Sequence, residues 1–308
     1  MITVEGLTKV YGHRTALDDV SFEVPAGEIF GFVGPNGAGK TTTLRILAAL
    51  LEPTSGRAFV DGADVSQQPD RVHERLGYMP DFFGVYDQLT AFEYLDFYAA
   101  CYRQPKARRK KIADDLLELV GLSDRRDQSV DTLSRGLKQR LCLARALVHD
   151  PAVLLLDEPA SGLDPRARVE MREILKELQT MGKTIMISSH ILPELTELCT
   201  MVGIIDHGRM RATGSVDEVI QRLTSGRRLR ISVLGHKEEA VAVLKPLPAV
   251  QAVSLVNGAI EAQYEGDDAA AAGILQALTA AGVKVSGFNQ EAGGLEDAFL
   301  KATSEEDR

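Results

Sequence analysis

The chain has 308 residues, 26% of them charged, and a formal net charge of −9. This length predicts one large domain plus a small one, and the acidic balance argues against non-specific nucleic-acid binding, which needs a broad basic surface. No apolar run approaches the roughly 18 residues that span a bilayer, and the first nine residues do not resemble a signal peptide, so we expect a cytoplasmic chain.

The first third of the sequence predicts mixed β structure. Compact apolar runs indicate short strands, and Asp61-Gly62 indicates a turn after one of them. The expected strands are 2–4, 21–24, 29–33 and 58–60. The strand at 29–33 matters most, because a glycine-rich loop and a helix-like segment at 43–51 follow it directly.

That loop matches the phosphate-binding pattern GxxxxGK[ST], in the strand-then-helix context that the pattern requires. Its residues are Gly34, Pro35, Asn36, Gly37, Ala38, Gly39, Lys40, Thr41 and Thr42. Backbone N–H groups of such a loop point at phosphate oxygens, a lysine neutralises phosphate charge, and a threonine hydroxyl can bind Mg²⁺. We interpret it as a nucleotide site, the alternative being a glycine loop that merely turns.

The middle of the chain, from about residue 90 to 146, has the three- and four-residue apolar spacing of helices. Early in this stretch lies a basic cluster that acidic residues follow at once. A solvated helix start explains it best, and contact with acidic lipid headgroups or an acidic partner is the alternative. The cluster comprises Arg103, Lys106, Arg108, Arg109, Lys110 and Lys111.

Residues 133–137, Leu-Ser-Arg-Gly-Leu, precede another helical run. Ser134 and the N–H groups near Gly136 could form a helix N-terminus, which is a favourable place for phosphate. A second phosphate site so far along the chain from the first has no evident use within one monomer.

Strands return in the next part of the chain, at 153–156, 184–188 and 202–206, separated by helix-length segments. This alternation predicts a parallel sheet covered on both faces. The first of these strands ends in Asp157 and Glu158. Asp157 can hold the Mg²⁺ shell, while Glu158, one residue on, points elsewhere and can polarise an attacking water.

The sequence changes character around residues 224–228, and a β-α-β-β-α-β order follows, which fits a ferredoxin-like module. Asn257-Gly258 between two strand patterns is a strong hairpin signal. Elsewhere, three scattered cysteines without metal-ligand spacing predict reduced, mostly buried thiols.

Taken together, these motifs resemble the nucleotide-binding subunit of ATP-binding cassette (ABC) transporters, whose signature motif is LSGGQ. In that family the signature of one subunit closes over the γ-phosphate held by the other, so the resemblance implies a dimer around two ATP molecules. It also implies that Tyr11 stacks on adenine and that Ser161–Asp164 is the D-loop at the dimer seam. His190 resembles the switch histidine that contacts the γ-phosphate.

Two departures from the family pattern stand out. Asp81 occupies the place of the Q-loop glutamine, and its shorter, charged side chain could still meet Mg²⁺ or its water. In the signature, Arg135 and Leu137 replace Gly and Gln, whereas Ser134 and Gly136, the γ-phosphate contacts, are kept. This combination resembles the ABC-2 exporter type.

The resemblance implies an α/β P-loop NTPase cassette over residues 1–222. It would have a RecA-like parallel core, an antiparallel β subdomain and a helical signature subdomain at about 85–150, followed by the ferredoxin-like domain at 223–308. Catalysis would fall to Glu158 and His190, with ATP and Mg²⁺ as cofactors.

The implied partners are a second cassette, identical or different, and a separate membrane permease. The chain would lie on the inner face of the cell membrane, and the aromatic region at 82–100 would face the permease. Two alternatives remain at this point: a cassette protein without a transporter, acting on ribosomes or DNA, and a P-loop kinase with a regulatory tail.

Overall fold

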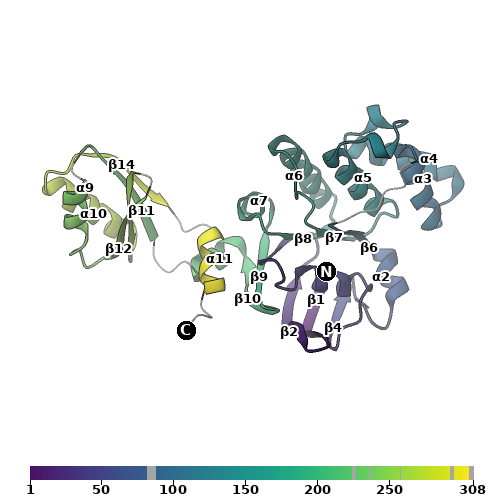
Figure 1. Cartoon of the computed structure of the whole chain (residues 1–308), viewed down its shortest axis with the longest axis horizontal. Helices are drawn as coiled ribbons and strands as arrows, with labels where there is room; N and C mark the ends of the chain where they lie inside the picture. The colour runs from purple at the N-terminus through teal and green to yellow at the C-terminus, as the bar shows by residue number, and fades with distance from the viewer. Residues whose placement is uncertain (82–87, 224–226, 236, 257, 292–294, 305–308) are drawn as a thin grey trace. The chain divides into compact units, whose positions relative to one another are not determined.

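The computed structural model describes residues 1–81, 88–223, 227–235, 237–256, 258–291 and 295–304. Contacts within the chain divide it into two compact units, Met1–Val216 and Asp217–Arg308. This division lies a few residues before the boundary at 222/223 expected from the sequence. Figure 1 shows the strands and helices of both units.

A six-stranded sheet forms the centre of the first unit, in the order β10-β9-β3-β8-β7-β6. All neighbours are parallel except β10 and β9. Every residue of β3 and β7 is buried, as expected for parallel strands covered on both faces. The predicted parallel sheet is therefore confirmed. Its strands are β3 (Ile29–Val33), β6 (Leu76–Met79), β7 (Val153–Asp157), β8 (Thr184–Ser189), β9 (Met201–Asp206) and β10 (Arg209–Ser215).

Three helices follow the central strands. The glycine loop after β3 leads into α1 (Lys40–Leu47), β7 leads through the D-loop into α6 (Pro165–Thr180), and β8 precedes α7 (Leu192–Leu198). Because β3, β8 and β7 are parallel neighbours, the segments that follow them meet at one edge of the sheet. We therefore expect the functional site at this edge of the sheet.

A second, antiparallel sheet has the order β2-β1-β4-β5, and α2 (Pro69–Arg75) follows it. β1 (Ile2–Tyr11) and β2 (Arg14–Val24) are longer than the predicted strands. Their outer parts carry polar residues facing solvent, which an apolar-run criterion does not detect. Their inward side chains share one core with β3, where Phe22 and Phe30 stack with ring centroids 5.3 Å apart. The short partners are β4 (Ser55–Val60) and β5 (Ala63–Asp64).

The helical part of the first unit contains α3 (Ala91–Cys101), α4 (Lys106–Leu119) and α5 (Arg135–Leu147). Short 3-10 turns, η1 (Ser123–Arg125) and η2 (Val130–Thr132), connect α4 to α5. The helix α3 begins at a capping box between Thr90 and Glu93. In the basic cluster, Arg109 pairs with Asp96 of α3 at 3.5 Å, while the other five residues are exposed.

The second unit follows the predicted β-α-β-β-α-β order, and its sheet has the order β12-β13-β11-β14 with antiparallel neighbours. Apolar side chains of the sheet, such as Ile231 and Tyr264, form one core with Ile274 and Leu278. Its elements are α8 (Val216–Leu223, shared with the first unit), β11 (Arg227–Val233), α9 (Lys237–Leu244), β12 (Val250–Val256), β13 (Ala259–Tyr264), α10 (Asp268–Ala280), β14 (Val285–Glu291) and α11 (Leu295–Ser304).

Within the described ranges, no helix combines the length and the apolar character needed to cross a bilayer. The three cysteines are free thiols; Cys142 and Cys199 are buried and Cys101 is exposed. The expectation that most of the cysteines are buried is confirmed.

Candidate active site

The glycine-rich loop between β3 and α1 has no room for a side chain at two positions. Gly39 has φ 113°, and a Cβ there would lie 2.6 Å from Cδ2 of Leu17. A Cβ on Gly34 would lie 2.3 Å from the carbonyl oxygen of Ile205. The glycines therefore allow the loop to pack closely against β2 and β9 before α1 begins.

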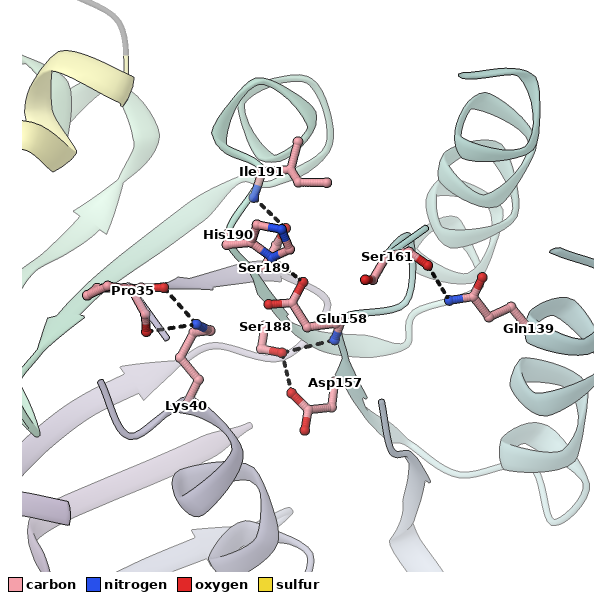
Figure 2. Close-up of polar contacts among 11 residues, drawn as sticks. Pro35, Lys40, Gln139, Asp157, Glu158, Ser161, Ser188, Ser189, His190 and Ile191 are labelled. Carbon is pink, nitrogen blue, oxygen red and sulfur yellow. Dashed lines mark hydrogen bonds and ion pairs between the residues drawn. The ribbon is translucent and has the colours of Figure 1, made fainter. Parts of the chain in front are cut away.

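Lys40, the first residue of α1, is buried at the base of this loop with 7% of its surface exposed. Its Nζ donates to the carbonyl oxygens of Gly34 at 2.6 Å and Pro35 at 3.2 Å (Figure 2). Burial lowers the pKa of Lys40, while the negative charges of Glu158 and Asp157 raise it. The loop therefore brings a poorly solvated cation into the range of the acidic pair on β7.

Asp157 and Glu158 both depend on Ser188 of the neighbouring strand. Asp157 and Ser188 are register partners, and the Ser188 hydroxyl donates to Oδ1 of Asp157 at 2.6 Å (Figure 2). The backbone N–H of Glu158 donates to the Ser188 hydroxyl at 3.0 Å and to the Ser188 carbonyl at 3.2 Å. One serine thus fixes a carboxylate that is only 2% exposed and the backbone that carries the next one.

Glu158 has the left-handed backbone (φ 51°) that side-chain-bearing residues rarely adopt. Its Oε2 lies 2.8 Å from Nδ1 of His190, and its side chain is 15% exposed, against 52% for His190. Burial raises the pKa of Glu158, while His190 and Lys40 oppose that rise. The Glu158 carboxylate is therefore a partly buried group, paired with His190 at the end of β7.

The predicted signature and D-loop residues lie at the starts of two helices. Ser134 caps α5, accepting a hydrogen bond from the Leu137 N–H at 3.4 Å, and Asp164 caps α6, accepting one from the Ala167 N–H at 2.9 Å. In the described part of the chain, neither Ser134 nor Gly136 forms a hydrogen bond or ion pair with the glycine-rich loop. The structure of one chain therefore does not bring the two predicted phosphate sites together.

Three further candidate residues lie on the surface. Tyr11, at the end of β1, is 46% exposed, and the Lys9 ammonium lies 5.2 Å from the centre of its ring. Thr41 is exposed in the first turn of α1, beside the buried Lys40. Asp81 is exposed after β6; the aromatic residues predicted to face a partner at 82–86 lie outside the described residues.

The site combines a glycine loop between a buried strand and a helix with an acidic pair on a parallel strand of the same sheet. This architecture defines a P-loop nucleoside triphosphatase.

Comparisons with known proteins identify the family. The ABC transporter family matches residues 17–161. The chain is 32% identical over 305 residues to the linearmycin resistance ATP-binding protein LnrL of Bacillus subtilis, covering 98% of each chain. It is 38% identical over 244 residues to the daunorubicin/doxorubicin resistance ATP-binding protein DrrA of Streptomyces peucetius, covering 79% of this chain and 74% of DrrA.

Solved structures of similar fold belong to the same family. An ATP-binding subunit of an ABC transporter superposes with a TM-score of 0.66 at 30% identity, covering 72% of this chain and 92% of that one. A dimeric ATP-binding cassette bound to ADP and Pi gives a TM-score of 0.64 at 25% identity, covering 70% and 98%. The chain belongs to the ATP-binding subunits of ABC transporters, which hydrolyse ATP. The predicted family and cassette fold are confirmed.

The roles of two site residues were not predicted from the sequence. Ser188 was predicted only as part of a strand, because its role depends on the pairing of β8 with β7. Gln139 is 2% exposed and donates from Nε2 to the carbonyl oxygen of Ser161 at 3.2 Å. The one local signal for Gln139 was a polar residue at a core position of a helix.

Proposed function

We propose that the chain binds MgATP at the loop between β3 and α1 and hydrolyses it as a dimer, driving a separate membrane permease in export. The observation that carries the catalytic part is the hydrogen-bonded pair of Glu158 and His190 beside the buried Lys40. Names of relatives support the direction: LnrL and DrrA are resistance proteins, and the Nod factor export ATP-binding protein of Ralstonia nicotianae is 40% identical over 220 residues.

In this proposal the loop holds the phosphates of ATP. Loop residues 36–39 offer their backbone N–H groups, since Pro35 has none. Lys40 exchanges its bonds to loop carbonyls for bonds to the β- and γ-phosphates, and Thr42 adds a contact at the start of α1. Tyr11 offers an exposed ring on which adenine stacks, with Lys9 near the same ring.

The residues present fit a magnesium ion that arrives with the nucleotide. Mg²⁺ is commonly bound by one or two protein ligands plus substrate phosphates, and the described residues hold no cluster of three or more His, Cys, Asp or Glu that would form a metal cage. Thr41 and Asp157 would hold it, and its charge would stabilise the charge developing on the phosphates. The role of Asp81 in this shell, direct or through water, rests on its position after β6 alone.

Glu158 would act as general base toward the attacking water. Burial shifts the pKa of Glu158 in the direction that favours this role, since an effective base has a pKa closer to the working pH than an exposed glutamate. His190 orients the carboxylate through Nδ1 and leaves its exposed ring able to reach the γ-phosphate.

The dimer explains why Ser134 and Gly136 lie apart from the loop of their own chain. We propose that they cover the γ-phosphate bound by a second chain, with Asp164 at the seam between the two. Cassette dimers are known among the structural relatives. The helix N-terminus at Ser134 offers N–H groups to an anion.

A groove of about 440 Å³ is the surface that we propose binds the permease. It lies between the end of α1, β6 and α3, close to Asp81 in the sequence, and it contains exposed apolar and aromatic surface such as Leu50 and Tyr102. A helical segment of a permease could insert here. Its lining residues are Ala48, Leu50, His73, Leu76, Tyr78, Tyr98, Cys101, Tyr102, Arg145 and Ala146.

Purification of the tagged chain from detergent-solubilised membranes tests this assignment. We expect an integral membrane protein to copurify in a fixed ratio and its removal to change the ATPase rate. Charge reversal at the exposed Lys176, far along α6, serves as a control that should leave the complex intact. Copurification with ribosomes in place of a membrane protein would instead support the non-transport alternative.

The pH dependence of the ATPase rate tests Glu158. Because burial raises the pKa of this carboxyl above its ordinary 4.5, the base is protonated and inactive over a wider acidic range than an exposed glutamate. We expect kcat/KM to rise with pH through an apparent pKa above 4.5. An acidic limb at or below that value, measured under conditions where the chain stays folded, would contradict a buried base.

A further inference from the structure

Side chains that have no role in the proposed hydrolysis hold the start of α5 against the D-loop of the same chain. Gln139 donates from Nε2 to the carbonyl oxygen of Ser161 at 3.2 Å, across from Glu158 (Figure 2). The Gln139 side chain is 2% exposed, and its Oε1 has no hydrogen-bond partner in the described structure. The buried amide group of Gln139 therefore bonds to the D-loop through its NH2 group.

Arg135 makes the next contact. Gly162 has φ 70°, and a Cβ built on it would lie 2.6 Å from both Cζ and Nη1 of Arg135. The guanidinium group therefore lies directly against the backbone of Gly162, in the space that any side chain would fill. Arg135 stands where the family signature has glycine, so this chain makes a contact that the usual signature lacks.

Close packing and backbone hydrogen bonds complete the connection. A Cβ on Gly136 would lie 3.3 Å from Cδ2 of Leu163, so α5 approaches the D-loop with little free space. The D-loop also bonds to the backbone of Glu158, since the Ser161 N–H donates to the carbonyl oxygen of Glu158 at 3.1 Å. A continuous set of contacts thus runs from the signature helix through the D-loop to Glu158.

We propose that Gln139 and Arg135 are positioning residues that clamp the D-loop to the signature helix and so set the orientation of Glu158 in their own chain. The inference rests on the proposed function, in which Ser134 and Gly136 meet the nucleotide of a second chain. Displacement of the D-loop would therefore shift Glu158 within the same chain.

Kinetics of two single variants test the clamp. Gln139→Met keeps the volume and removes the donor, and Arg135→Ala removes the guanidinium. We expect each to lower kcat about tenfold, because small displacements of a catalytic group are costly, while KM for ATP stays within about twofold. Arg57→Ala is the matched control, since its exposed side chain pairs with Glu5 at 3.1 Å on the antiparallel sheet; its kcat should be unchanged.

Thermal unfolding of each variant separates positioning from loss of structure. Arg135 is exposed, so its alanine variant should melt within a few degrees of the wild type. If both clamp variants keep the wild-type kcat, or if they raise KM and leave kcat unchanged, the proposal is overturned.

A double-mutant cycle tests the contact of Arg135 with Gly162 directly. Gly162→Ala should lower kcat by forcing the guanidinium away and by straining the left-handed backbone. In the Arg135→Ala background the first effect is absent, so the same substitution should cost several-fold less. Strict additivity of the two substitutions would mean that the contact does not act on catalysis.

Gel filtration with ATP distinguishes failure of this inference from failure of the proposed function. We expect Glu158→Gln to form an ATP-dependent dimer, with or without Gln139→Met. A chain that stays monomeric would contradict the dimer, and with it the proposed function on which the inference rests. Dimer formation combined with wild-type turnover of the clamp variants would overturn the clamp alone.

Discussion

Replacing Glu158 with glutamine should lower kcat by about 10²- to 10⁴-fold, the usual contribution of a general base. The amide has nearly the same shape and can still contact His190, which lies 2.8 Å from the carboxylate, but it cannot take a proton from water. ATP affinity should remain near that of the wild type, because the phosphate loop is untouched. Single-turnover and steady-state measurements with radiolabelled ATP give both quantities.

The same variant should accumulate a dimer that retains ATP, since hydrolysis is the step that would release the two chains. Glu173→Gln is the matched control, because it makes the same change on the exposed surface of α6 and should give no trapped dimer. Turnover of Glu158→Gln near the wild-type rate would show that another group activates the water.

Replacing Lys40 with alanine should weaken ATP binding at least 100-fold, corresponding to about 2.7 kcal/mol. The lysine is buried against the loop, so no other described cation takes its position between the carbonyl oxygens of Gly34 and Pro35. Its loss also leaves Asp157 and Glu158 without the charge that interacts with both. Isothermal titration calorimetry with ATP and with ADP measures the effect.

Lys176→Ala provides the control for this experiment, because it removes an equal charge from the exposed surface of α6. Thermal unfolding checks that Lys40→Ala remains folded, since the substitution shortens a buried side chain. Unchanged ATP affinity in a folded Lys40→Ala protein would remove the assignment of the loop as the phosphate cradle.

The sequence was most informative where function depends on consecutive residues. The glycine loop with Lys40 and the strand that ends in Asp157 and Glu158 are contiguous patterns, and their strand and helix contexts were predictable from local periodicity. The order of elements in the second unit was predictable for the same reason, because each strand and helix there carries its own pattern.

Contacts between distant segments were not predictable. Ser188 holds Asp157 and Glu158 only because β8 lies between β3 and β7, a choice of strand order that no local pattern contains. The contact of Gln139 with Ser161 joins a helix to a loop in the same way. The full lengths of β1 and β2 were not predicted, because solvent-facing polar residues there interrupt the apolar runs.

The weak cap at Ser134 has a consequence for how two chains could separate. A hydroxyl group has one donor and two acceptor positions, and the cap uses only an acceptor, at 3.4 Å from the Leu137 nitrogen. The donor is therefore available to a phosphate oxygen while the helix end stays satisfied. In the proposed dimer, association with a second chain and release from it would leave the local fold of α5 intact, so the same segment would serve in every turnover.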